Sequence, residues 1–211
     1  MGDRTVEVVD GGRRIAFSFD DVLKYHGGGS PGGAAIGFQA LARALPLLGP
    51  DGPCERRAIV VATAFGGPGA RDAVELVTRA VTGDRFRVDP ALTRPERGRV
   101  LERFVFRLGV GSRAVTLLLR DGFVTEEFID LARAGTRDAD QDRRLTALKQ
   151  QLADRLMAQA ADEVYDVEAA GVQRRSRSAS SNVDSHTPPS SSARRTTGSH
   201  SASSSARRSS P

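Results

Sequence analysis

The chain has 211 residues, with 31 lysines and arginines against 26 aspartates and glutamates, and its length suits one domain of ordinary size with a further segment. No apolar run approaches the ~20 residues of a membrane span, and the residues after Met1 lack the apolar part of a signal peptide, which favours a cytoplasmic protein with no membrane partner. The single cysteine, Cys54, excludes an intrachain disulfide and a thiolate metal cluster within one chain.

The positive charge is concentrated near the C-terminus. Residues 171–211 consist almost entirely of Ser, Thr, Arg, Ala, Pro and Gly, and they carry seven arginines and one aspartate. Their net charge is +6, so residues 1–170 carry −1. Because this composition cannot bury enough apolar surface to offset the entropy of ordering, we expect a disordered tail over 169–211 after a single domain over 1–168. The charge therefore indicates no specific nucleic-acid site on the folded domain.

The first predicted elements are a β-hairpin and a short helix. Residues 5–9 and 14–19 are β-prone runs separated by Asp10-Gly11-Gly12, which is typical of a hairpin. Residues 19–26 begin with two acidic residues and continue with apolar ones, which predicts a short helix. We expect this helix to place His26 at the start of the next loop.

The loop that follows is the most prominent candidate site in the sequence. Residues 26–33 contain five glycines, which let the backbone adopt positive φ and approach a ligand closely. Ser30 has the position of an N-cap and Pro31 that of the first helical residue, so a helix should run over 31–48. Its free N–H groups could hold an anion, a carboxylate or a metal-bound oxygen. In the simpler alternative, a glycine-rich turn joins two helices and Ser30 only caps.

Strands and helices alternate irregularly over the rest of the folded part. Further strands are predicted over 57–65, 86–88, 103–110 and 113–119, the last two as an antiparallel pair. Further helices are predicted over 70–82, 125–134 and 137–160. A second glycine-rich turn, 66–69, separates the strand at 57–65 from its helix. This pattern indicates an α+β domain with a mixed or antiparallel sheet flanked by helices.

The order of motifs over about 15–168 is similar to that of a known family. His26-Gly27-Gly28-Gly29-Ser30-Pro31-Gly32 opens the first long helix, and Gly69-Ala70-Arg71-Asp72-Ala73 opens the helix after the strand at 57–65. The chain resembles the formylmethanofuran dehydrogenase E-like domain family, in which these motifs read His-Gly-His-x-Cys-Pro-Gly and Cys-x-x-Asp-Ala. The later apolar hairpin, the Glu126-Glu127-Phe128 helix, the charged helix and the closing segment at 164–167 are also similar.

The resemblance implies a zinc or thiol site, and this chain departs from it at most of the reactive positions. Gly28, Ser30, Gly69 and Ala80 stand where the family has its second histidine and its cysteines. His26 and Asp72 remain. Since zinc needs about four ligands, three of them from protein even in catalytic sites, these two residues make only a weak alternative metal site, and we expect no cofactor.

The candidate catalytic residues are His26, Ser30 and Asp72. Ser30 could act as a nucleophile with His26 as its base and Asp72 orienting the histidine, while the N–H groups of Gly32 and Gly33 form an oxyanion hole. In the competing interpretation Ser30 caps, His26 packs or binds water, and Asp72 caps or pairs with an arginine. The candidate substrate-binding residues are Tyr25, Gly27, Gly28, Gly29, Gly32, Gly33 and Gly69.

Two functions from different classes follow from these patterns. The first is a small-molecule enzyme or binding protein of this fold, in specialised biosynthesis, that works without thiol chemistry on a small-molecule ligand. The alternative is a noncatalytic accessory protein of a larger complex that acts through its long helix at 137–160 or its basic tail. Leucines 145, 148, 152 and 156 form a narrow seam on that helix, which covers an edge of the core or pairs with a second copy in a homodimer.

Overall fold

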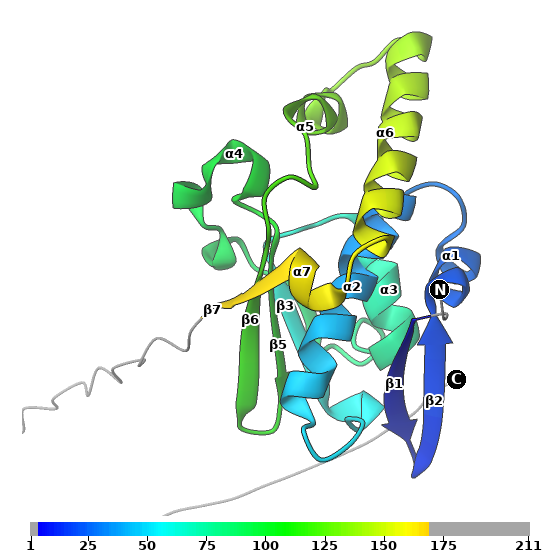
Figure 1. The fold of residues 1–211 in the computed structure, drawn as a ribbon, viewed down its shortest axis with the longest axis vertical. Coiled ribbons are helices and arrows are strands. Elements are labelled where there is room, and N and C mark those ends of the chain that lie inside the picture. The colour runs from blue at the N-terminus through cyan, green and yellow to red at the C-terminus, as the bar shows by residue number, and fades with distance from the viewer. Residues whose placement is uncertain (1–3, 169–211) are drawn as a thin grey trace, which may run out of the picture. The chain divides into compact units, whose positions relative to one another are not determined.

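A computed structural model describes residues 4–168 (Figure 1). It confirms the predicted α+β fold, with a two-stranded sheet, a five-stranded mixed sheet and helices packed against them. The predicted tail over 169–211 lies outside the described residues. Among residues 4–168, no helix combines the length and the apolar character needed to cross a bilayer.

The N-terminal elements have the predicted form. β1 (Thr5–Asp10) and β2 (Arg13–Ser18) pair in an antiparallel hairpin, and α1 (Phe19–His26) follows directly. The hydroxyl of Ser18 accepts the N–H of Asp21, and the Asp21 carboxylate accepts the N–H of Ser18, so a capping box starts the helix. Gly27 ends it with a φ of 75°, a backbone conformation that favours glycine. α1 therefore places His26 at the beginning of the glycine-rich loop.

α2 (Pro31–Leu48) is the central helix of the described unit. It lies between the five-stranded sheet and the β1–β2 hairpin, and it also packs on α3 and α6 (Figure 1). Fourteen of its eighteen residues are buried, so almost its whole circumference is in the core rather than one face. Small side chains let the neighbouring helix approach closely, because a Cβ on Gly37 would lie 2.8 Å from the Cα of Ala70.

The larger sheet has the strand order β4-β3-β5-β6-β7. Its strands are β3 (Ile59–Thr63), β4 (Phe86–Val88), β5 (Val105–Val110), β6 (Arg113–Leu119) and β7 (Tyr165–Glu168). β3 and β4 are parallel and the other neighbours are antiparallel, so the sheet is mixed. β3 begins later than predicted because η1 (Arg56–Ala58) forms a 3₁₀ turn before it. β7 is not among the predicted strands.

The remaining helices border the sheet and the central helix. They are α3 (Pro68–Thr78), α4 (Gly98–Leu101), α5 (Glu126–Arg133), α6 (Ala139–Met157) and α7 (Ala161–Val164), with 3₁₀ turns η2 (Pro90–Leu92) and η3 (Pro95–Arg97). α3 ends four residues before the predicted end at Thr82. Arg79 takes a left-handed conformation there, and the Glu75 carboxylate accepts the N–H groups of Val81 and Thr82, which stops the helical hydrogen bonding.

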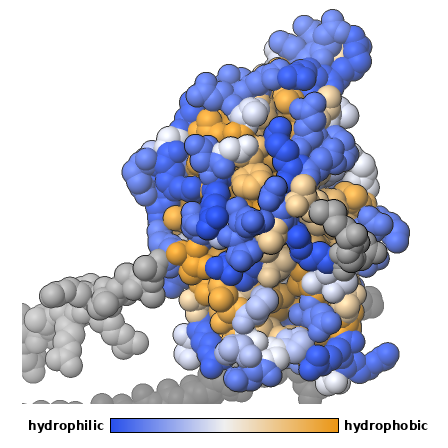
Figure 2. All heavy atoms as spheres, viewed as in Figure 1, coloured by the Kyte–Doolittle hydropathy of each residue, from blue (hydrophilic) through white to orange (hydrophobic). Residues whose placement is uncertain are grey.

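The leucine seam of α6 lies inside the chain. Leu145, Leu148, Leu152 and Leu156 are all buried, and α6 packs against α2 and α5. The prediction that the seam covers an edge of the core is therefore confirmed. The free upper end of α6 is covered with hydrophilic residues (Figure 2).

Candidate functional site

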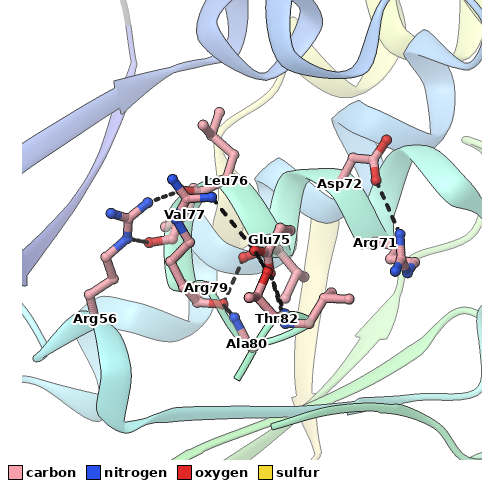
Figure 3. Close-up of polar contacts among 12 residues, drawn as sticks. Arg56, Arg71, Asp72, Glu75, Leu76, Val77, Arg79, Ala80 and Thr82 are labelled. Carbon is pink, nitrogen blue, oxygen red and sulfur yellow. Dashed lines mark hydrogen bonds and ion pairs between the residues drawn. The ribbon is translucent and has the colours of Figure 1, made fainter. Parts of the chain in front are cut away.

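The structure brings together two of the predicted catalytic residues, His26 and Asp72. Nδ1 of His26, at the end of α1, lies 2.7 Å from Oδ2 of Asp72, in the second turn of α3. The side chain of His26 is 8% exposed and that of Asp72 is 25% exposed. The Arg71 guanidinium lies 3.7 Å from the other Asp72 oxygen (Figure 3). The pair joins residues that are 46 positions apart, and it depends on the packing of α1 against α3.

This contact determines what the His26 ring can offer to a ligand. In the tautomer whose Nδ1–H donates to Asp72, Nε2 is the ring nitrogen that can accept a hydrogen bond. Nε2 is buried and has no hydrogen-bond partner among the described residues. A buried polar atom without a partner costs about 1–3 kcal/mol, so a hydrogen-bond donor on a ligand would be stabilised here.

His26 lines a cavity of about 560 Å³. The cavity wall also includes the end of the glycine-rich loop, the turn between β3 and α3, the residues before β5, and parts of α5 and α6. Phe65, Phe104 and Phe128 are among its apolar lining residues, and the rings of Phe65 and Phe104 are stacked with their centroids 4.8 Å apart. A cavity of this size with apolar walls and a few polar groups is typical of small-molecule sites.

Ser30 lines the same cavity but is not bonded to His26. No hydrogen bond joins the two side chains within residues 4–168. Ser30 occupies the N-cap position of α2, as predicted, yet its side chain makes no capping hydrogen bond. The interpretation of Ser30 as a side-chain cap is therefore wrong. Its Oγ lies close to Gly33 instead, since a Cβ at Gly33 would be 2.9 Å from it.

Of the glycines predicted to bind substrate, Gly29 lines the cavity and three others serve helix packing. Gly32 and Gly33, at the start of α2, and Gly69 in α3 are buried. A Cβ at Gly69 would lie 2.6 Å from the backbone oxygen of Ser30, and one at Gly32 would lie 2.8 Å from the backbone oxygen of Lys149. These glycines let α3 and α6 approach the start of α2.

The other predicted substrate-binding residues lie on the surface. Tyr25, Gly27 and Gly28 are exposed or partly exposed and are not among the residues that line the cavity. Gly32 and Gly33 do not line it either, so their N–H groups are not placed as the predicted oxyanion hole. The cavity thus collects His26, Gly29 and Ser30 from the predicted set, with Asp72 behind the histidine.

The zinc site that the resemblance implies does not fit these residues. Within residues 4–168, no group of three or more His, Cys, Asp and Glu side chains is arranged to hold a metal ion. His26 and Asp72 bond to each other, which leaves one histidine nitrogen rather than a set of ligands facing a common point. Cys54 is buried elsewhere in the core, between β1 and α2, and burial raises the pKa of its thiol.

The sequence reasoning missed the aromatic and basic residues of the cavity. Phe65, Phe104 and Phe128 come from three separate segments, as do the basic residues Arg103, Arg133 and Lys149. One local signal was available, because Phe65 directly precedes the second glycine-rich turn. The other residues meet there only through the tertiary fold.

Comparisons of the chain with protein-family models, with curated proteins and with solved structures found no match. The resemblance to the formylmethanofuran dehydrogenase E-like domain family stays a prediction.

Proposed function

We propose that this protein binds a small molecule in the cavity beside His26 and acts on it as an enzyme, as a divergent member of the formylmethanofuran dehydrogenase E-like fold without thiol or metal chemistry. The observation that carries the proposal is the His26–Asp72 pair. It fixes one ring nitrogen of a buried histidine at 2.7 Å from a carboxylate and leaves the other without a partner in the described part of the chain.

The chemistry that this arrangement favours is proton transfer. Asp72 orients the ring and stabilises the charge that forms when Nε2 accepts a proton from a bound molecule. A positioned base of this kind contributes typically 10²–10⁴-fold to a rate. The Ser30 hydroxyl in the cavity wall supplies a second polar group, as a hydrogen-bond partner of the ligand or as the nucleophile that His26 would activate.

A ligand screen on the full chain tests this proposal. Ligand-observed NMR of a mixture of small fragments would identify molecules that bind the wild-type protein. We expect His26→Ala and Ser30→Ala to weaken their binding, and Ala132→Trp, which fills the cavity from α5, to abolish it. Arg120→Gln, at an exposed position just after β6, is the matched control and should bind as wild type does.

Binding that survives in both cavity variants would contradict the proposal. Fragments that bind Ala132→Trp and His26→Ala as tightly as the wild type would have to bind elsewhere, and the cavity would then have no such function. Circular dichroism of each variant shows whether a loss of binding reflects unfolding.

The accessory-protein alternative receives less support from the fold. Its helix version requires an exposed apolar seam on α6, and the four leucines of that seam are buried within the chain. Its tail version concerns residues outside the described part. Deletion of 171–211 tests it, because unchanged binding of a partner after that deletion would exclude the tail as the contact.

A further inference from the structure

We infer that the ligand of the cavity is a small aromatic acid, whose ring lies among the three phenylalanines and whose carboxylate lies near Arg103 and Lys149. The inference rests on the proposed function and names the substrate class of the same site.

The first observation is the charge of the cavity wall. Its ionisable residues are His26, Arg103, Arg133 and Lys149, and no aspartate or glutamate lines it. Arg133 has a carboxylate partner, since its guanidinium lies 3.3 Å from Glu102. Among the described residues, no carboxylate lies within 4.0 Å of Arg103 or of Lys149. The wall therefore carries positive charge that an anionic ligand would balance.

The second observation is how Lys149 is held. Its Nζ donates a hydrogen bond to the backbone oxygen of Gly29 at 3.0 Å, which fixes the ammonium group at the glycine-rich loop. The ammonium group has three N–H donors, and the carbonyl oxygen of Gly29 accepts only one of them. The other two remain available to a carboxylate. Arg103 is exposed and comes from a different segment of the wall, just before β5.

The third observation is the aromatic character of the apolar wall. Phe65 and Phe104 stack on each other and come from just after β3 and just before β5, and Phe128 comes from α5. Aromatic rings pack on one another in stacked or edge-to-face arrangements, which favours a flat aromatic ligand over a branched aliphatic one. A simple inorganic anion would leave this surface unused. The volume of about 560 Å³ accommodates a molecule with one or two rings.

The test uses 2-naphthoate as the probe and 2-naphthamide as its neutral analogue of the same shape. The chain contains no tryptophan, so naphthalene fluorescence can be followed with little background from the protein. We expect the acid to bind the full-length wild type about 10-fold more tightly than the amide, because charge-assisted hydrogen bonds are roughly twice as strong as neutral ones. Added salt should weaken binding of the acid more than binding of the amide, because salt screens the attraction between charges.

Variants assign the effect to the named residues. Arg103→Gln and Lys149→Met should each weaken binding of the acid several-fold and leave binding of the amide unchanged. The double variant should bind the acid and the amide equally. Phe128→Ala should weaken binding of the acid and of the amide to the same extent. Arg120→Gln, whose guanidinium pairs with Asp166 outside the cavity, is the charge-matched control and should change neither.

Three results would overturn the inference. They are equal binding of acid and amide, an unchanged preference in the double variant, and no binding of the acid at all. If both probes bind equally and Ala132→Trp abolishes their binding, the proposed function stands and only the ligand class is wrong. The fragment screen decides separately whether the cavity binds small molecules.

Discussion

Two carboxylates three residues apart on α3 are used in different ways. Glu75 is 5% exposed, and its carboxylate accepts the N–H groups of Val81 at 2.8 Å and Thr82 at 3.0 Å as well as the Thr82 hydroxyl (Figure 3). Asp72 holds the His26 ring, whose second nitrogen has no partner among the described residues. The Glu75 carboxylate therefore has its partners within the described residues, whereas the Asp72 pair leaves Nε2 of His26 without one.

Arg56 reinforces the Glu75 end of α3. Its Nε donates to the backbone oxygen of Val77 at 2.8 Å, and a second nitrogen donates to that of Leu76 (Figure 3). A third nitrogen lies 3.2 Å from Asp10. Side-chain hydrogen bonds from Arg57 and Arg56 hold the pKa of Asp10 below its usual value. These contacts satisfy carbonyls at the helix end that would otherwise lack partners. The comparison predicts that changes to the Glu75 cluster affect stability, whereas changes to the His26–Asp72 pair affect what the cavity does.

The largest expected effect on stability is that of Glu75→Gln. The glutamine carbonyl can still accept the N–H groups of Val81 and Thr82, but the charge that strengthens these hydrogen bonds is lost and an NH2 group replaces the oxygen that accepts the Thr82 hydroxyl. Because hydrogen bonds to charged groups contribute about 1.5–3 kcal/mol, we expect about 3 kcal/mol less unfolding free energy, measured by urea denaturation. Binding of 2-naphthoate by the folded fraction should be unchanged. A loss of binding without loss of stability would reverse the comparison.

The next effect tests the packing of α3 on the start of α2. In Gly69→Ala the new Cβ would lie 2.5 Å from the backbone nitrogen of Ala34 and 2.6 Å from the oxygen of Ser30, so backbone must move. We expect a loss of about 2 kcal/mol, within the usual range for overpacking. Gly66→Ala, in the turn just before α3, is the matched control, because a Cβ there meets nothing within 4 Å. Equal unfolding free energies for the two variants would contradict the close approach.

The acid dependence of stability follows from the Glu75 cluster. Burial favours a higher pKa, but the hydrogen bonds from Thr82 and Val81 and the charge of Arg79 outweigh it and hold the Glu75 pKa below its usual value. A lowered pKa in the folded state contributes stability above the unfolded pKa, and this contribution is lost as the pH falls through the folded pKa. The difference in unfolding free energy between wild type and Glu75→Gln should therefore be constant near pH 7 and shrink below about pH 4. A difference that grows on acidification would show the opposite shift.

The smallest expected effect on stability is that of Asp72→Asn. The asparagine oxygen can still accept the hydrogen bond from His26 Nδ1–H, so we expect a change of about 1 kcal/mol or less in unfolding free energy. The ring loses the charge that orients it and supports proton transfer, so turnover of any substrate found in the screen should fall by about 10-fold or more. A variant that unfolds as readily as Glu75→Gln would show that Asp72 is structural too.

Local signals in the sequence predicted much of the fold around the site. The turn at Gly11-Gly12, the acidic start of α1 and Pro31 at the start of α2 act within a few residues, so the elements between them were predicted with nearly correct bounds. The early end of α3 was missed because it depends on where the Glu75 side chain points. The strand β7 was missed because four residues form it only by pairing with β6.

The part of the candidate site that depends on short-range sequence was also predicted. His26 and Ser30 share one loop, so their presence in one cavity follows from short-range sequence. The contact of His26 with Asp72 was one of two interpretations of the residue types, the other being that Asp72 caps or pairs with an arginine, and it needs the packing of α1 on α3 to form. The cavity's aromatic and basic residues lie as far apart as Phe65 and Lys149, and no periodicity connects them.

The central position of α2 has a consequence for how the chain folds during synthesis. The helix is complete at Leu48, yet some of its partners lie more than 100 residues later: Gln39 donates to the backbone oxygen of Gln159, and the Tyr165 hydroxyl donates to that of Ile36. An apolar helix made early must therefore wait for α6 and β7 to emerge from the ribosome before it is fully covered. Non-local pairing of this kind slows folding and leaves apolar surface open to aggregation in the meantime. Chains shortened before Tyr165 should accordingly depend on chaperones that shield α2.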